Sequence, residues 1–113
     1  MRVWTMKRIA ALIFLILAIA GCTAEGRYDE FAQCLSEENA TMFGTDWCSH
    51  CQNQKAAFRG SFEHIDYVDC DEDRAECDAA GVRGYPTWRI DGDTYAGEQS
   101  LQKLSALTGC SLE

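Results

Sequence analysis

The chain has 113 residues and a formal net charge of −8, with 10 Lys and Arg side chains against 18 Asp and Glu side chains. That length accommodates one domain. Residues 25–113 hold 7 of the basic and all 18 of the acidic side chains, so this part carries a net charge of −11. Binding to nucleic acid, or docking on anionic lipid through a basic patch, is not expected, because both need clustered Lys and Arg.

The N-terminal segment has the features of an export signal. Met1–Arg8 is basic, and an unbroken apolar run of 12 residues follows at Ile9–Ala20. That run is too short to span a hydrocarbon core of about 30 Å comfortably, but it fits the apolar region of a signal peptide. The following Gly21-Cys22 resembles the lipobox of bacterial lipoproteins, in which cleavage precedes a lipidated cysteine. A plain signal peptide, or an uncleaved anchor with Cys22 incidental, is the alternative.

We therefore predict an export signal at residues 1–22, a tether at 23–27 and one folded domain at 28–113. The domain would lie outside the cytoplasmic membrane, anchored to it by lipid, in a compartment where disulfides persist. With Cys22 lipidated, an even set of cysteines remains, as pairing requires. These are Cys34, Cys48, Cys51, Cys70, Cys77 and Cys110.

Hydrophobic patterning predicts an alternating α/β order, α-β-α-β-α-β-β-α, without internal repeats. The expected helices are 28–38, 48–59, 71–80 and one spaced by Leu101, Leu104 and Leu107. The expected strands are 40–43, 65–68 and 87–90, with a return strand beginning at 94–95. Asp91-Gly92-Asp93 is a hairpin turn signal.

The segment Trp47-Cys48-Ser49-His50-Cys51 places two cysteines, separated by two residues, at the start of a helix after a strand. Unpaired N–H groups and the partial positive charge of a helix N-terminus favour a thiolate over a thiol. Cys48 lies at the exposed tip and is the expected nucleophile. Cys51 lies one turn deeper, where it can attack a mixed disulfide and release the partner.

The residues around these cysteines have two interpretations each. An imidazole at His50, beside the thiolate, would stabilise the reduced pair and make its disulfide a stronger oxidant. Alternatively, His50 is a solvated residue at a helix start without a role. Trp47 either shields the site and shapes a docking surface or is a core aromatic.

Pro86, the chain's single proline, stands in Gly84-Tyr85-Pro86-Thr87 at the entry to a strand. The WCxxC motif in its strand–loop–helix setting, followed by a proline that opens a later strand, resembles the pattern of the thioredoxin-fold family. The resemblance implies a central mixed β-sheet flanked by helices, a cis Pro86 facing the cysteines, and a Tyr85 whose backbone pairs with substrate. A trans proline on an edge strand is the alternative.

Three segments resemble one subgroup more narrowly: 31–35, the run from Met42-Phe43-Gly44 to Lys55, and 81–88. They are similar to the thioredoxin-like domain associated with bacterial and archaeal vitamin K epoxide reductase homologues. That resemblance implies a periplasmic-type oxidoreductase whose electron partner is such a reductase homologue or another quinone-linked membrane oxidase. Met42 stands where many thioredoxins carry a buried Asp, so the proton-relay role of that Asp does not transfer. Ser49-His50 replaces the Gly-Pro pair of reducing thioredoxins and is closer to the pairs of oxidants and isomerases.

The remaining four cysteines are expected to form structural disulfides. Cys70 and Cys77 are close in sequence, so a local pair is favoured, and Cys34 would then pair with Cys110 by elimination. Free buried thiols are the alternative. A zinc site using Cys70 and Cys77 with the CxxC pair lacks the usual second x2 spacing.

No metal or organic cofactor is expected. The acidic run 69–73 lacks the Gly and Glu that a calcium loop requires at its sixth and twelfth positions, where Arg74 and Ala80 stand.

The sequence thus predicts a monomeric, lipid-tethered protein thiol–disulfide oxidoreductase acting as oxidant or isomerase on substrates that contain cysteines. Two alternatives stay open. One is a reductase of the same fold fed with electrons from the membrane. The other is a lipoprotein without catalysis, disulfide-rich or metal-binding.

Overall fold

The computed structural model describes residues 26–113. The predicted export signal, the predicted lipidation site Cys22 and most of the predicted tether lie outside the described residues. None of the helices formed by residues 26–113 has the length and apolar character needed to cross a bilayer.

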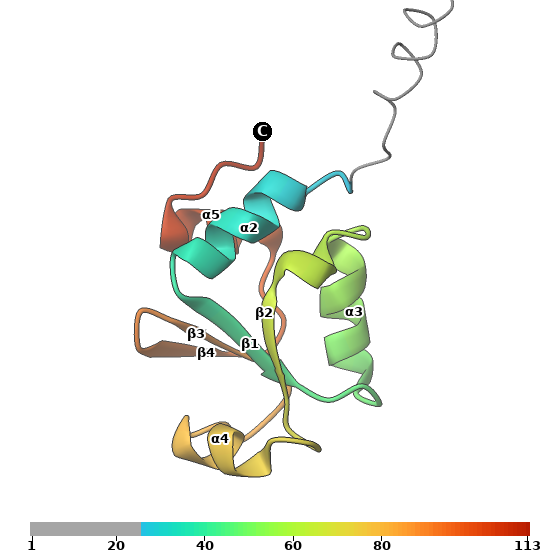
Figure 1. The fold of residues 1–113 in the computed structure, drawn as a ribbon, viewed down its shortest axis with the longest axis vertical. Coiled ribbons are helices and arrows are strands. Elements are labelled where there is room, and N and C mark those ends of the chain that lie inside the picture. The colour runs from blue at the N-terminus through green and yellow to red at the C-terminus, as the bar shows by residue number, and fades with distance from the viewer. Residues whose placement is uncertain (1–25) are drawn as a thin grey trace, which may run out of the picture.

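The described chain alternates helices and strands, as the sequence patterning predicts (Figure 1). The helices are α2 (Asp29–Glu37), α3 (Ser49–Ala57), α4 (Arg74–Ala79), α5 (Leu101–Thr108) and the short 3₁₀ helix η1 (Phe62–His64). The strands are β1 (Ala40–Gly44), β2 (Asp66–Asp69), β3 (Thr87–Ile90) and β4 (Asp93–Ala96).

The strands form one mixed sheet in the order β2-β1-β3-β4. β1 pairs with β2 in parallel and with β3 antiparallel, and β3 and β4 form an antiparallel hairpin. All five residues of β1 are buried, because this strand lies between neighbours and is covered on both faces. The strand that precedes the CxxC segment is therefore the most enclosed element of the sheet.

Successive residues of β1 point to opposite faces of the sheet, and each face has its own helices. Met42 lies in register with Tyr67 and Trp88, on the face whose core is shared with α2, α3 and α5. Phe43 lies in register with Val68, in a smaller cluster that includes Cys77 of α4. This arrangement confirms the predicted architecture of a mixed sheet flanked by helices.

Local hydrogen bonds explain where the structure departs from the predicted boundaries. α4 begins at Arg74, three residues later than predicted, because the backbone N–H of Asp71 donates to the Asp69 side chain and the N–H of Asp73 donates to the Asp69 carbonyl. These bonds form a turn before the helix. The 3₁₀ helix η1 was not predicted, since three residues are too short for a periodic signal.

The hairpin turn is one residue shorter than its sequence signal. Asp91 and Gly92 both have positive φ, 49° and 88°, which two-residue hairpin turns of this twist require. Asp93 already pairs with Ile90 and belongs to β4. At the end of the domain, Gly109 ends α5 in the left-handed conformation, with φ 79°.

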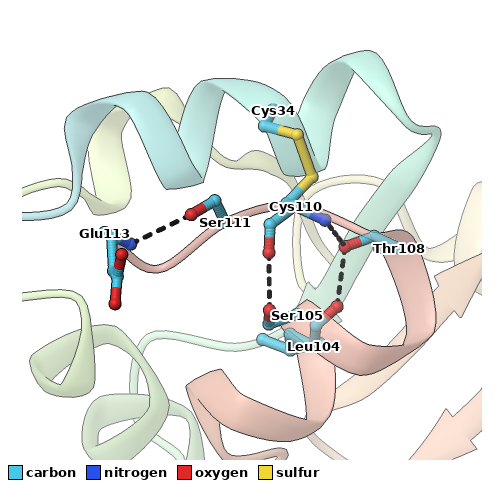
Figure 2. The surroundings of a disulfide bond; sticks show 7 residues. All are labelled: Cys34, Leu104, Ser105, Thr108, Cys110, Ser111 and Glu113. Atoms are coloured by element: carbon cyan, nitrogen blue, oxygen red, sulfur yellow. Dashed lines mark hydrogen bonds between the residues drawn. A yellow bond between two sulfur atoms is a disulfide. The ribbon is translucent and has the colours of Figure 1, made fainter.

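Two disulfides join elements of the domain in the expected pairs. Cys34 on α2 is bonded to Cys110 after α5, across a sequence separation of 76 residues (Figure 2). Cys70 and Cys77 are bonded across seven residues. Cys48 and Cys51 are free thiols, so the structure holds the CxxC pair in its reduced form.

Candidate active site

Cys48 is the N-cap residue of α3, immediately after β1 and a short loop. Its backbone is extended, with φ −73° and ψ 124°, so the following N–H groups turn back toward its half-buried sulfur. The backbone N–H of Cys51 lowers the pKa of the Cys48 thiol most, and the backbone N–H of His50 and the Cys51 side chain lower it further. Partial burial and the carboxylate of Glu98 act in the opposite direction. The helix start thus favours a thiolate, as helix N-termini generally do.

Cys51 lies in a different environment, one turn along the same helix. Its side chain is fully buried, and this burial raises its pKa to about 11. The backbone N–H of Thr45 and the charge of Lys55 counteract that increase only in part. The two sulfurs therefore have unequal pKa values, with the reactive one at the surface and the protonated one beneath it.

Gly44 and Met42 leave room for the buried sulfur. A Cβ atom at Gly44 would lie 2.8 Å from Sγ of Cys51 and 3.5 Å from the methyl carbon of Met42, so the last residue of β1 must lack a side chain. Met42 is fully buried and stands where many thioredoxins have an Asp. This side of Cys51 is consequently apolar, which agrees with the direction of its pKa shift.

Tyr67 of β2 reaches the same region. A Cβ atom at Gly44 would also lie 3.4 Å from its ring, and Lys55 places its Nζ atom 4.2 Å from the ring centroid. The Tyr67 hydroxyl is buried and has no hydrogen-bond partner among residues 26–113. Burial, followed by nearby carboxylates, raises the pKa of this phenol well above its usual range, so Tyr67 is neutral near Cys51.

The loop before β3 faces the exposed cysteine. The Tyr85–Pro86 peptide bond is cis, and the thiol of Cys48 donates to the carbonyl oxygen of Tyr85 at 3.7 Å. Pro86 is fully buried. The chain thus brings residues 48 and 85, which are 37 positions apart, into direct contact and places a backbone carbonyl beside the Cys48 thiol.

Trp47 lies on the surface, with 67% of its area exposed, so it is not a core aromatic. Its indole N–H donates to Oδ2 of Asp71 at 2.8 Å. Its ring meets the ring of Tyr85 edge to face, with centroids 6.2 Å apart. Trp47 therefore links the loop after β2 with the loop before β3, next to Cys48.

The His50 imidazole has a partner, Glu98, that neither sequence interpretation included. Nδ1 of the imidazole lies 2.7 Å from Oε2 of Glu98. A carboxylate only accepts hydrogen bonds, so Nδ1 carries the hydrogen in this contact. The effect of His50 on the pKa of Cys48 comes from its backbone N–H. No sequence spacing connects His50 with Glu98, which is 48 residues away.

Gln54 is a second residue that sequence reasoning missed. Its buried side chain accepts from the indole N–H of Trp88 at 3.0 Å and from the backbone N–H of Gln99 at 2.7 Å. It also donates to the Gln99 carbonyl oxygen at 2.9 Å. α3 is thereby fixed to β3 and to the segment before α5. A single polar residue on the buried side of a helix gives no sequence signal that would identify these partners.

The cysteines of the zinc alternative are separated in the structure. Cys70 and Cys77 are oxidised to a disulfide, and a disulfide sulfur is not a thiolate ligand for zinc. Cys48 and Cys51 form a pair at the start of α3. In this state the four sulfurs do not provide a thiolate set for a structural zinc site.

Comparison with known proteins agrees with this geometry. The thioredoxin family model matches residues 23–108. The chain belongs to the thioredoxin family. Its fold resembles a thioredoxin mutant from Halobacterium salinarum, with a TM-score of 0.52 and 25% identity over 81% of this chain and 97% of that one.

Two relatives of similar sequence are named as a thiol–disulfide oxidoreductase and as a protein disulfide isomerase-like protein. The chain is 36% identical over 91 residues to thiol-disulfide oxidoreductase LTO1 of Arabidopsis thaliana, covering 73% of this chain and 24% of the relative. It is 32% identical over 77 residues to protein disulfide isomerase-like 2-2 of Oryza sativa, covering 56% and 21%. The chain thus spans about a quarter of the length of these relatives. The matches support a thiol–disulfide redox function on a thioredoxin fold.

The unequal thiols of this thioredoxin predict ordered alkylation. In the reduced chain, iodoacetamide should modify Cys48 first, with a rate that rises with pH around a midpoint below that of an ordinary free thiol and then levels off. Cys51 should react only as the pH approaches about 11. Mass spectrometry of the alkylated peptides at each pH measures both profiles. A Cys48 midpoint at or above that of a free thiol would contradict the inferred effect of the helix start.

The same two pKa shifts make the stability of the reduced fold depend on pH in opposite directions. The lowered pKa of Cys48 contributes stability that is complete above the unfolded thiol pKa and is lost as the pH falls through the folded value. The raised pKa of Cys51 contributes stability that is complete below the unfolded value and is lost as the pH rises toward about 11. Unfolding of the reduced chain at graded pH would measure the sum of these contributions.

Proposed function

We propose that this thioredoxin-family chain is an extracytoplasmic protein thiol–disulfide oxidoreductase that uses Cys48 and Cys51 as its redox pair. The observation that carries this proposal is the contrast between the two sulfurs. A half-exposed thiol with a lowered pKa lies at the start of α3, and a buried thiol with a raised pKa lies one turn below it. Exchange reactions use such a pair, one sulfur to attack and one to resolve.

The reaction proceeds through one mixed disulfide. When the pair is oxidised, a substrate thiolate attacks Sγ of Cys48, the Cys48–Cys51 bond breaks, and Cys51 leaves as a thiolate that takes up a proton. A second substrate thiolate then attacks the substrate sulfur of the mixed disulfide, and the Cys48 thiolate leaves. The substrate gains one disulfide, and two electrons pass to the pair. Because Cys48 has the lower pKa, it is the better leaving group in the second step.

Substrate chains would lie across the surface formed by Trp47, Tyr85 and Pro86. Tyr85 already directs a carbonyl oxygen at Cys48, and Trp47 is exposed beside it. The carbonyl can accept a backbone N–H from an extended substrate segment, and the two aromatic rings offer an apolar contact. We assign Trp47 and Tyr85 to substrate binding and Pro86 to the shape of the loop that carries Tyr85.

The two additional disulfides support an oxidising compartment, because such bonds are rare where glutathione and thioredoxin keep thiols reduced. The x-His pair in the motif supports oxidant or isomerase work. The proposed route of reoxidation is a quinone-linked membrane oxidase, such as a vitamin K epoxide reductase homologue, which would accept the two electrons. Lipid attachment at Cys22 would keep the domain near that oxidase. A reductase fed from the membrane is the alternative direction of electron flow.

Trapping tests the proposed roles. The Cys51→Ala variant should accumulate mixed disulfides at Cys48 with scrambled secreted proteins, because the Cys48 thiolate attacks a substrate disulfide and releases one substrate thiolate, and the matched Cys48→Ala variant should accumulate none. The reduction potential of the pair tests the direction. A value near −120 to −180 mV, roughly the range of strong oxidants and isomerases, supports our assignment, whereas a value near about −270 mV indicates a reductase. Failure of Cys51→Ala to capture any protein would overturn the proposal.

A further inference from the structure

The loop after β4 holds Glu98 in a defined place beside the redox pair. On one side of it, the backbone N–H of Gly97 donates to the Pro86 carbonyl oxygen at 2.8 Å. On the other side, Gln99 exchanges two hydrogen bonds with the buried Gln54 of α3. Glu98 therefore lies between two residues that are fixed to the proline loop and to the helix of the CxxC motif.

The side chain of Glu98 faces α3. Its Oε2 atom accepts from Nδ1 of His50 at 2.7 Å. This is the separation of a strong, charge-assisted hydrogen bond. The contact determines where the imidazole lies, because the flexible side chain of His50 is 67% exposed and makes no other hydrogen bond among residues 26–113.

Glu98 disfavours the thiolate form of Cys48 in two ways. The carboxylate lies near enough to Cys48 to raise the pKa of its thiol by charge repulsion. It also pairs with the imidazole at 2.7 Å, so any positive charge on His50 lies directly against a negative one and attracts a thiolate less. Both effects disfavour the thiolate and hence the reduced form of the pair, which makes the disulfide a weaker oxidant.

We infer that Glu98 is a positioning residue that holds the His50 imidazole against its own carboxylate and keeps the Cys48–Cys51 pair more reducing than its CxHC sequence alone would make it. The inference rests on the proposed function of this pair. Glu98 takes no part in bond formation. Besides its own repulsion of the thiolate, it acts through its pairing with His50, and that dependence on His50 makes the inference testable.

The solvent exposure of Glu98 and His50 limits how large the effect of their ion pair can be. The Glu98 side chain is 39% exposed and that of His50 67%, and ion pairs exposed to this degree are worth up to about 1 kcal/mol. Replacing Glu98 by Ala should therefore raise the equilibrium constant for reduction of the pair by glutathione about threefold. At 30 mV per tenfold change for a two-electron couple, that corresponds to about 14 mV.

The experiment is a double-mutant cycle on the full chain, with glutathione titrations of the unaltered protein, Glu98→Ala, His50→Asn and the double variant. Glu37→Ala, an exposed carboxylate on α2 at the opposite end of β1, is the matched control and should leave the constant unchanged. In the His50→Asn background, the Glu98→Ala effect should fall below half its size on a logarithmic scale. In about 1 M salt, where charges are screened beyond about 3 Å, the Glu98→Ala effect should shrink.

Three results would overturn the inference. They are no rise with Glu98→Ala, a rise of half or more of its logarithmic size in the His50→Asn background, and an effect that is unchanged in high salt. Folding of each variant is checked by circular dichroism, so that a shifted equilibrium is not caused by a lost fold, and the dependence on His50 separates a positioning role from a merely structural one. If the unaltered pair does not equilibrate with glutathione, the proposed function fails and the inference fails with it. An unaltered pair that titrates normally beside an unshifted Glu98→Ala variant overturns the inference alone.

Discussion

Replacing Cys48 by Ser is expected to reduce disulfide exchange by at least about a thousandfold, because a hydroxyl cannot form the mixed disulfide through which the reaction passes. The assay is oxidation of a reduced peptide with two cysteines, with glutathione disulfide as the terminal oxidant. A hydroxyl is close to a thiol in size, and Cys48 is only half-buried at the start of α3. The fold should therefore persist, and the loss can be assigned to the chemistry.

Cys51→Ser is the matched comparison for that variant. It leaves Cys48 at the helix start, with the backbone N–H groups that lower its pKa. The Cys48 thiolate should attack glutathione disulfide and release one glutathione thiolate, and the mixed disulfide should accumulate, because no neighbouring sulfur is present to resolve it. Turnover should then depend on attack by free thiols from solution. Full turnover by Cys48→Ser, or no accumulated adduct with Cys51→Ser, would reverse or remove the roles assigned to the two sulfurs.

The sequence could predict this part of the site because its determinants are local. A strand, a tight loop and a helix start place Cys48 and Cys51 within four residues of each other, and the helix supplies the N–H groups whatever the rest of the fold does. Pro86 was identifiable by its place before a strand. The order of helices and strands along the chain follows from hydrophobic patterning, and Asp91-Gly92-Asp93 marked the hairpin turn. The mixed sheet was implied by the resemblance to the thioredoxin fold.

Other determinants were not predictable, because they depend on tertiary contacts between distant segments. Trp47 contacts Asp71, and His50 contacts Glu98, across 24 and 48 residues. Glu98 is one of many acidic side chains in this chain, so composition does not single it out. The environment of Cys51 likewise depends on the packing of Met42, Gly44 and Tyr67 from two strands. Local patterns identified the candidate nucleophile, whereas the groups that surround it appeared only in the folded chain.

The two structural disulfides should differ in what their removal costs. In the chain-entropy model, the closed loop between Cys34 and Cys110, with a separation of 76 residues, contributes about 4.5 kcal/mol of stability. The loop between Cys70 and Cys77, with a separation of seven residues, contributes about 2.5 kcal/mol. Urea unfolding of the double variants Cys34→Ala/Cys110→Ala and Cys70→Ala/Cys77→Ala, against the unaltered chain, measures both losses. A larger loss for the short loop would show that chain entropy is not the main contribution here.

The effects of the two disulfides on the redox site should have the opposite ranking. β1 separates the α2 end of the domain, which carries Cys34, from the α3 start, which carries Cys48 (Figure 1). Cys70 follows β2 at the same end as Cys48, and the next residue, Asp71, accepts from the Trp47 indole. In folded protein, loss of the long disulfide should therefore leave the alkylation profile of Cys48 unchanged, while loss of the short one should loosen Trp47 and increase its fluorescence quenching by solvent. Two covalent links of the same chemistry would then serve different parts of the molecule: the first stabilises the domain, and the second holds the rim around the nucleophile.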